Sequence, residues 1–250
     1  MASSSADDFA ITESDAGSFV FACFFFFIVT NMFAGADKVD IACEQQTGFS
    51  EADGVFEVWQ FFYIVVILGA LEQFVATSTR PDFGLPNVLF GCAWIALSFW
   101  TFFISQKDNV SLMFATLASV AVATLAMAAT TSANLFKGKL DALFQRPVTA
   151  IAFSSFAGWS FIVAVINILM LVNADYDKRD NCEETLSMAP LALTIAFVAL
   201  GYYFCDPVII GPILWALTNL PPTILRSICI TIGAVGIVVA VYRMANKQPK

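Results

Sequence analysis

Long runs without any charged side chain are the feature that most constrains how this chain can fold. Residues 55–79 are apolar apart from Glu57 and Glu72, and other long runs contain no Asp, Glu, Lys or Arg, among them 16–36, 83–106, 109–136, 147–174, 185–205 and 227–242. A helix needs roughly 17–25 apolar residues to cross a bilayer. The runs are continuous rather than alternating, which excludes a closed barrel of strands. We therefore predict an all-α, polytopic integral membrane protein with about seven transmembrane helices.

Composition and charge agree with this class. Hydrophobic residues make up 59% of the chain, and its mean hydropathy is +0.78, both too high for a soluble domain. We expect an acidic tail at 1–15, one transmembrane domain at 16–243 and a basic tail at 244–250. The net charge of −8 argues against a nucleic-acid partner. The expected partners are the lipid bilayer and either further copies of the chain or other membrane subunits.

Prolines interrupt the chain between the sixth and the last span. Residues 206–222 contain Pro207, Pro212, Pro221 and Pro222, each of which removes a backbone donor. We predict an interrupted or re-entrant stretch there. Seven spans put the C-terminal tail on the same side as Lys107, and a small excess of Lys and Arg would place that side in the cytoplasm. An eighth span would move the tail to the opposite side.

Two similar acidic phrases suggest an internal repeat. The sequence "DKVDIACE" begins at Asp37, and "DKRDNCEE" begins at Asp177. A parallel repeat of three spans, a linker and three spans would comprise residues 16–106, 110–134 and 157–243, an arrangement found in transporters. The alternative is convergence of two solvated loops. Both interpretations stay open at this point.

The linker segment 110–134 differs from the other spans because it is rich in Ala, Ser and Thr. A row of small residues runs through Ala115, Ser119 and Ala123. Small side chains allow helix backbones to approach closely in lipid. We therefore expect this helix to pack centrally, within the protomer or against another subunit.

No combination of residues indicates an enzyme. The chain has no histidine, which removes histidine-ligated metal and haem sites and histidine-based catalysis, and no lysine lies in a span. We expect no metal and no cofactor. Cys43 and Cys182 would form a disulfide if their loops face an oxidising compartment, and would otherwise be free thiols. The remaining four cysteines read as small hydrophobic residues: Cys23, Cys92, Cys205 and Cys229.

Polar groups inside apolar segments are the candidates for a transport path. Ionisable side chains there are costly unless they are paired or hydrated. The candidates are Glu72, Asn167, Asp206, Arg226 and Tyr63. Each has a structural alternative: Glu72 at the interface, Asp206 capping the next helix, Arg226 reaching the headgroups, and Asn167 bonding a neighbouring helix.

The second and third spans resemble the acetate uptake transporter family, that of the succinate–acetate permease. The residues that carry the resemblance are the pair Phe62 and Tyr63, "ALEQF" around Glu72, "DFGL" around Gly84, and Phe90, Gly91 and Trp94; "LFKGK" before the fifth span also fits. The signature Asn-Pro-Ala-Pro-Leu-Gly-Leu of that family's first span is missing. The resemblance implies uptake of a small monocarboxylate.

The sequence thus supports two functional hypotheses. The first is a multi-pass transporter or channel for a small solute such as a monocarboxylate. The second is a non-catalytic structural or assembly subunit of a larger membrane complex, which would purify with fixed partners.

Overall fold

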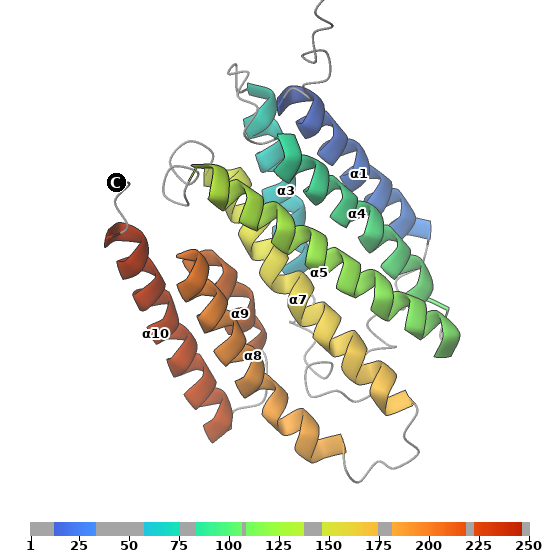
Figure 1. Ribbon diagram of the computed structural model, residues 1–250. Helices are drawn as coiled ribbons and strands as arrows, with labels where there is room; N and C mark the ends of the chain where they lie inside the picture. The colour runs from blue at the N-terminus through green and yellow to red at the C-terminus, as the bar shows by residue number, and fades with distance from the viewer. Residues whose placement is uncertain are drawn as a thin grey trace, which may run out of the picture.

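The computed structural model describes residues 13–33, 58–75, 84–106, 109–137, 147–174, 182–218 and 223–246. Within these ranges the chain is helical apart from short turns (Figure 1). The helices are α1 (Glu13–Phe33), α3 (Val58–Val75), α4 (Gly84–Ile104), α5 (Asn109–Lys137), α7 (Pro147–Ala174), α8 (Cys182–Phe204), η4 (Pro207–Ile210), α9 (Gly211–Thr218) and α10 (Ile224–Asn246). Cys43 and residues 1–12 of the predicted tail at 1–15 lie outside the described residues, as does the side chain of Cys182, so the disulfide stays a prediction.

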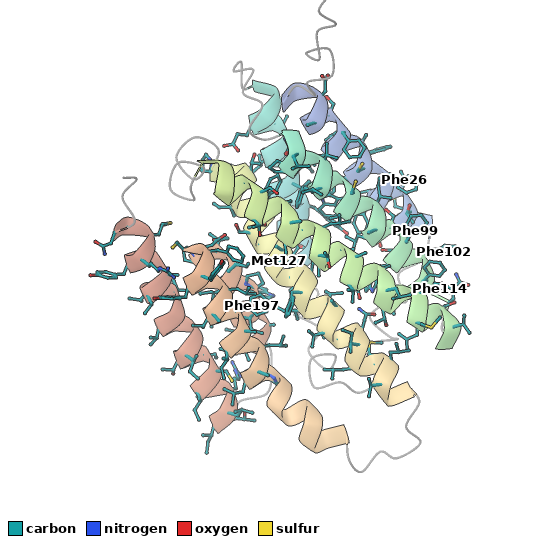
Figure 2. All side chains as sticks on the ribbon, viewed as in Figure 1. Phe26, Phe99, Phe102, Phe114, Met127 and Phe197 are labelled. Carbon is teal, nitrogen blue, oxygen red and sulfur yellow. The ribbon has the colours of Figure 1, made fainter. Side chains whose placement is uncertain are left out.

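The helix lengths confirm a multi-pass membrane protein. In the described ranges, five helices are long and apolar enough to cross a bilayer, namely α1, α4, α5, α7 and α10. The other two long helices have shorter apolar stretches, Gln60–Glu72 in α3 and Pro190–Phe204 in α8. Three of the phenylalanines labelled in Figure 2, Phe26, Phe99 and Phe102, are more than half exposed. Such apolar outer faces suit a lipid environment.

The helices form two groups that meet at α7. In the first group, α4 packs between α1 and α5, α5 packs between α4 and α7, and α3 lies against α7 and α1. In the second group, α8, η4, α9 and α10 pack on one another, and η4 and α9 also contact α7 (Figure 1). Ala115, Ser119 and Ala123 are buried, so the small-residue face of α5 packs against neighbouring helices within the protomer. The predicted sequence repeat stays a prediction.

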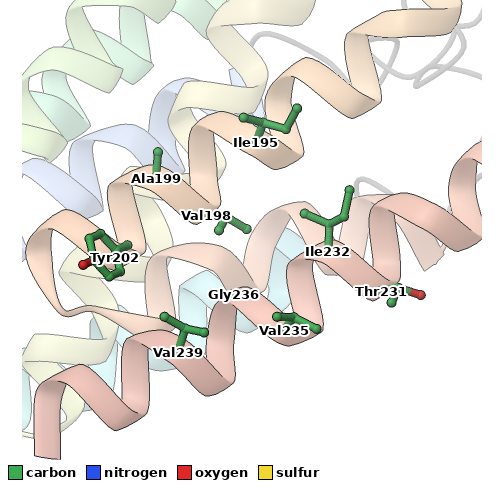
Figure 3. A pocket seen from close by; sticks show the side chains of 9 residues that line it. All are labelled: Ile195, Val198, Ala199, Tyr202, Thr231, Ile232, Val235, Gly236 and Val239. Carbon is green, nitrogen blue, oxygen red and sulfur yellow. The ribbon is translucent and has the colours of Figure 1, made fainter.

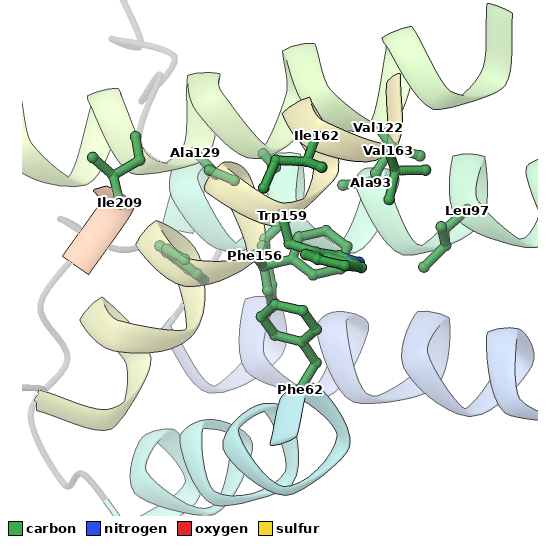
Figure 4. Packing of buried hydrophobic residues seen from close by; sticks show 14 of the residues in the cluster. Phe62, Ala93, Leu97, Val122, Ala129, Phe156, Trp159, Ile162, Val163 and Ile209 are labelled. Carbon is green, nitrogen blue, oxygen red and sulfur yellow. The ribbon is translucent and has the colours of Figure 1, made fainter. Parts of the chain in front are cut away.

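Aromatic rings fill the centre of the first group (Figure 4). Trp94 of α4 stacks on Phe156 of α7 with ring centroids 4.6 Å apart, and Phe62 of α3 meets Phe156 edge-on at 5.7 Å. Phe90 and Trp159 extend the cluster. Offset and edge-on aromatic pairs are stabilising beyond the area that they bury. The cluster fixes α3, α4 and α7 to one another.

The end of α8 determines the direction of the rest of the chain. Cys205 adopts a left-handed backbone conformation with a φ of 53°, and the amides of Cys205 and Asp206 donate to the carbonyls of Tyr202 and Gly201. This is the Schellman pattern that ends helices, with cysteine in the place usually taken by glycine. The chain then turns back and continues as η4 and α9.

The interrupted stretch is present as predicted. It runs from the end of α8 to the opposite end of the bundle, rather than turning back to the side on which it began. The η4–α9 segment extends about 20 Å, against roughly 30 Å for a hydrocarbon core. Thr218 at its end contacts Arg226 near the start of α10, while Tyr202 near the end of α8 contacts Arg243 near the end of α10. Helices α8 and α10 therefore run in the same direction (Figure 1), the arrangement that an eighth crossing requires.

Candidate functional site

Glu72 caps the start of another helix. Its carboxylate accepts hydrogen bonds from the backbone amide of Thr149 at 2.9 Å, from the Thr149 hydroxyl at 2.7 Å and from the amide of Val148 at 3.4 Å. These amides belong to the first turn of α7, which begins at Pro147. The first amides of a helix have no partner within it and favour a negative charge. Glu72 therefore ties α3 to the N-terminus of α7.

Asn167 links three helices inside the first group. Its side-chain oxygen accepts a hydrogen bond from the indole of Trp100 at 3.2 Å, and its amide nitrogen donates to the Val163 carbonyl at 2.8 Å. The Thr116 hydroxyl donates to the main-chain oxygen of Asn167 at 3.3 Å. These contacts join α4, α5 and α7, as the structural alternative for a buried asparagine predicts.

Asp206 lies at the junction between the two groups of helices. It is fully buried, and its carboxylate accepts hydrogen bonds from the Ser154 hydroxyl of α7 at 2.5 Å and from the Val208 amide at 3.0 Å. It is the N-cap of η4, as the structural alternative predicts. Because Ser154 belongs to α7, the same carboxylate also fastens the helix break to the first group.

Two glycines permit this junction. A Cβ atom at Gly158 of α7 would lie 2.7 Å from the carbonyl oxygen of Ile209, and one at Gly201 of α8 would lie 2.5 Å from the side chain of Ile210. Real Cβ atoms do not approach other atoms so closely. The absence of side chains at Gly158 and Gly201 therefore lets η4 pack directly against α7 and α8.

Two arginines stabilise helix ends in the second group. Arg226 donates to the Thr218 carbonyl at 2.8 Å, at the end of α9. Arg243 donates to the Tyr202 carbonyl at 2.6 Å, near the end of α8, and its guanidinium carbon lies 4.0 Å from the centroid of the Tyr202 ring. Cations at the C-terminal end of a helix interact favourably with its free carbonyls.

Tyr63 of α3 faces α1. Its hydroxyl oxygen accepts a hydrogen bond from the Asn31 side chain at 3.4 Å, and its ring packs against Phe24 and Phe27. Tyr63 and Asn167 thus lie in the first group, Arg226 lies in the second, and Glu72 and Asp206 each contact the first turns of α7. The structure does not bring the five predicted path residues together at one site.

A shallow groove lies between α8 and α10 (Figure 3). It has a volume of about 490 Å³, within the range of small-molecule pockets. The lining residues are Ile195, Val198, Ala199 and Tyr202 of α8 and Thr231, Ile232, Val235, Gly236 and Val239 of α10. A Cβ atom at Gly236 would lie 2.5 Å from Val198, so the two helices touch at the floor of the groove.

The groove opens sideways, because residues on both of its walls are exposed. Ile195, Val235 and Val239 have exposed fractions of 55%, 57% and 40%. In a membrane protein, an exposed apolar face of this kind suits lipid rather than water. The sequence did not indicate the groove, because Ala199 and Gly236 are ordinary small residues within apolar runs. The spacing of Thr231, Val235 and Val239 at every fourth residue is the signal that could have indicated one helix face.

The sequence matches a known protein family over most of its length. The model of the TSPO-like protein family matches residues 16–245. The chain belongs to the TSPO-like family. No match was found among curated proteins or among solved structures. The TSPO-like match covers nearly all of the described helices, from α1 to α10, and agrees with an integral multi-pass membrane protein.

Membership of the TSPO-like family shows that the resemblance to acetate uptake transporters is wrong. That resemblance used short aromatic and glycine motifs in α3 and α4. The structure gives them a general packing role: Phe62 and Trp94 belong to the aromatic cluster, and Gly91 faces Phe19, whose ring lies 2.6 Å from a Cβ atom built at Gly91. Closely packed membrane helices need such residues whatever the family.

Proposed function

We propose that this TSPO-like protein binds a small amphipathic molecule that enters from the bilayer into the groove between α8 and α10. The observation that carries the proposal is the groove itself, which is apolar along its walls and open on the lipid-facing side of the bundle. An alkyl chain that fills the groove gains van der Waals contacts with its walls, which bulk lipid makes less completely. Binding of this kind needs no catalytic group.

Transport of a small monocarboxylate along a polar path has less support. The side chains of Glu72, Asp206 and Arg226 form hydrogen bonds with backbone groups at helix ends. Asn167 accepts a hydrogen bond from Trp100 where three helices meet. These contacts favour structural roles for the four residues. A transport path through them stays a prediction, and so does the alternative of a structural subunit that purifies with fixed partners.

A bulky side chain inside the groove is expected to weaken ligand binding. Ala199→Phe places a ring in the groove, and we expect it to weaken the binding of tritiated dodecanol by about tenfold, since excluding two methylene groups costs roughly that much. Binding is measured by scintillation proximity on protein in phosphatidylcholine nanodiscs. Ala121→Phe is the matched control, because Ala121 is an exposed alanine on the outer face of α5. Equal dodecanol binding by both variants and the original protein would refute the proposal.

A further inference from the structure

The lipid-facing stripe of α10 continues beyond the groove to a cation. Thr231, Val235 and Val239 line the groove at intervals of four residues, and Arg243 is the next position of the same series. Residues four apart lie above one another on a helix face. On α8, Ile195, Ala199 and Tyr202 follow the opposite wall, and Tyr202 lies directly under the Arg243 guanidinium. Arg243 therefore stands at one end of the groove.

Arg243 has spare capacity to bind an anion. A guanidinium carries five N–H groups, and the hydrogen bond to the Tyr202 carbonyl uses only one nitrogen of the fork. Among the described residues no carboxylate forms an ion pair with Arg243; its contacts are a carbonyl oxygen and an aromatic ring. The planar fork matches a carboxylate in a bidentate geometry.

The aromatic residues around Arg243 place this end of the groove at the membrane surface. Tyr202, Tyr203 and Tyr242 have exposed fractions of 50%, 72% and 72%. Exposed tyrosines gather where the hydrocarbon core meets the headgroups, since the ring is apolar and the hydroxyl is polar. A charged head bound at Arg243 would stay at this depth, while the apolar groove continues toward the middle of the bilayer.

The dimensions of the groove between α8 and α10 suit a single alkyl chain. From Arg243 to Thr231 the helix rises about 18 Å, slightly more than half of a hydrocarbon core of roughly 30 Å. Contact between Gly236 and Val198 closes the floor, so the space lies between one pair of helices. A ligand with one chain buries its whole apolar part there, whereas the second chain of a phospholipid would lie outside the groove.

We propose that the occupant of the groove is a single-chain carboxylate amphiphile, with its alkyl chain along α8 and α10 and its carboxylate on Arg243. This inference rests on the proposed function, because it names the class of molecule that the groove binds. It makes Arg243 the residue that selects for negative charge, and Ala199 a residue that makes room for the chain.

The test compares dodecanoate with dodecanol on the same protein in phosphatidylcholine nanodiscs. The two probes share a chain and differ in the charge of the head. We expect the original protein to bind dodecanoate about tenfold more tightly than dodecanol, as charge-assisted hydrogen bonds allow. Arg243→Gln should abolish this preference, and the thermal unfolding of the variant in the same nanodiscs checks that it is folded.

A second variant tests whether the loss of any arginine that caps a helix end has the same effect. Arg226→Gln removes a similar bond to a helix-end carbonyl at the opposite end of α10, and we expect it to retain the preference for dodecanoate. Equal affinity for the two probes in the original protein, with Ala199→Phe still weakening both, would overturn the inference and leave the proposed function intact. If Ala199→Phe affects neither probe, the proposed function fails as well.

An anionic phospholipid headgroup carries the same negative charge and competes with the carboxylate for Arg243. Adding phosphatidylglycerol to the nanodiscs distinguishes the two sources. Dodecanoate binding that persists in its presence supports a single-chain ligand. Displacement of dodecanoate by phosphatidylglycerol at bilayer proportions would overturn the assignment to a single-chain carboxylate.

Discussion

Replacing Gly158 with alanine is expected to lower the free energy of unfolding by roughly 1–3 kcal/mol, the usual cost of overpacking. The added methyl group would lie 2.7 Å from the Ile209 carbonyl oxygen and 3.0 Å from Pro212. The first of these neighbours is main chain, which cannot move without displacing η4 from α7. The thermal unfolding of purified protein in nanodiscs, followed by tryptophan fluorescence, measures the loss.

Gly69→Ala is the matched control for Gly158→Ala. Both glycines lie within helices that pack together, α3 and α7, but a Cβ atom at Gly69 would be 3.6 Å from the nearest atom of Thr149, an ordinary contact. Because alanine is the better helix former, we expect Gly69→Ala to be neutral or to stabilise by up to about 1 kcal/mol. Equal unfolding temperatures for the two variants would contradict the close junction between α7 and η4.

Removing the carboxylate of Glu72 is expected to have the second large effect. Glu72→Ala removes the carboxylate that accepts hydrogen bonds from the first amides of α7 and from the Thr149 hydroxyl, and we expect a loss of about 1–3 kcal/mol. Glu72→Gln keeps one acceptor oxygen and should lose about half as much, because the negative charge at the helix N-terminus is gone. The same unfolding measurement applies.

Gln60→Ala provides the comparison on the same helix, since Gln60 is exposed near the start of α3. It should be nearly neutral. A fully stable Glu72→Ala protein would contradict the capping role. If Glu72→Gln were as stable as the original protein and yet lost transport of a small carboxylate, the path predicted from the sequence would regain support.

The sequence was sufficient for the class of fold because the relevant signal is local. Charge-free runs set the positions of the long helices to within a few residues, and the small residues Ala115 and Ser119 indicated the face of α5 that packs against other helices. The capping role of Asp206 was also foreseeable, since the prolines that follow it mark the start of a new helix.

Tertiary partners were not foreseeable in the same way. Glu72 is bonded to Thr149, which is 77 positions away, and no local pattern specifies that pair. The direction of α10 depends on whether η4 and α9 cross the bundle, which follows from packing at Gly158 and Gly201 rather than from hydropathy. Arg243 read as one more basic residue near the C-terminus until the structure placed it beside Tyr202.

Mapping the site of a photoreactive dodecanoate on the protein in nanodiscs tests the central claim most directly. A diazirine on the alkyl chain labels whatever side chains surround it, and mass spectrometry identifies the labelled peptides. The account predicts labels on residues 195–202 of α8 and 231–239 of α10, suppressed by an excess of unlabelled dodecanoate. Labels concentrated on α1, α3 or α4, or labels that the excess does not suppress, would contradict it.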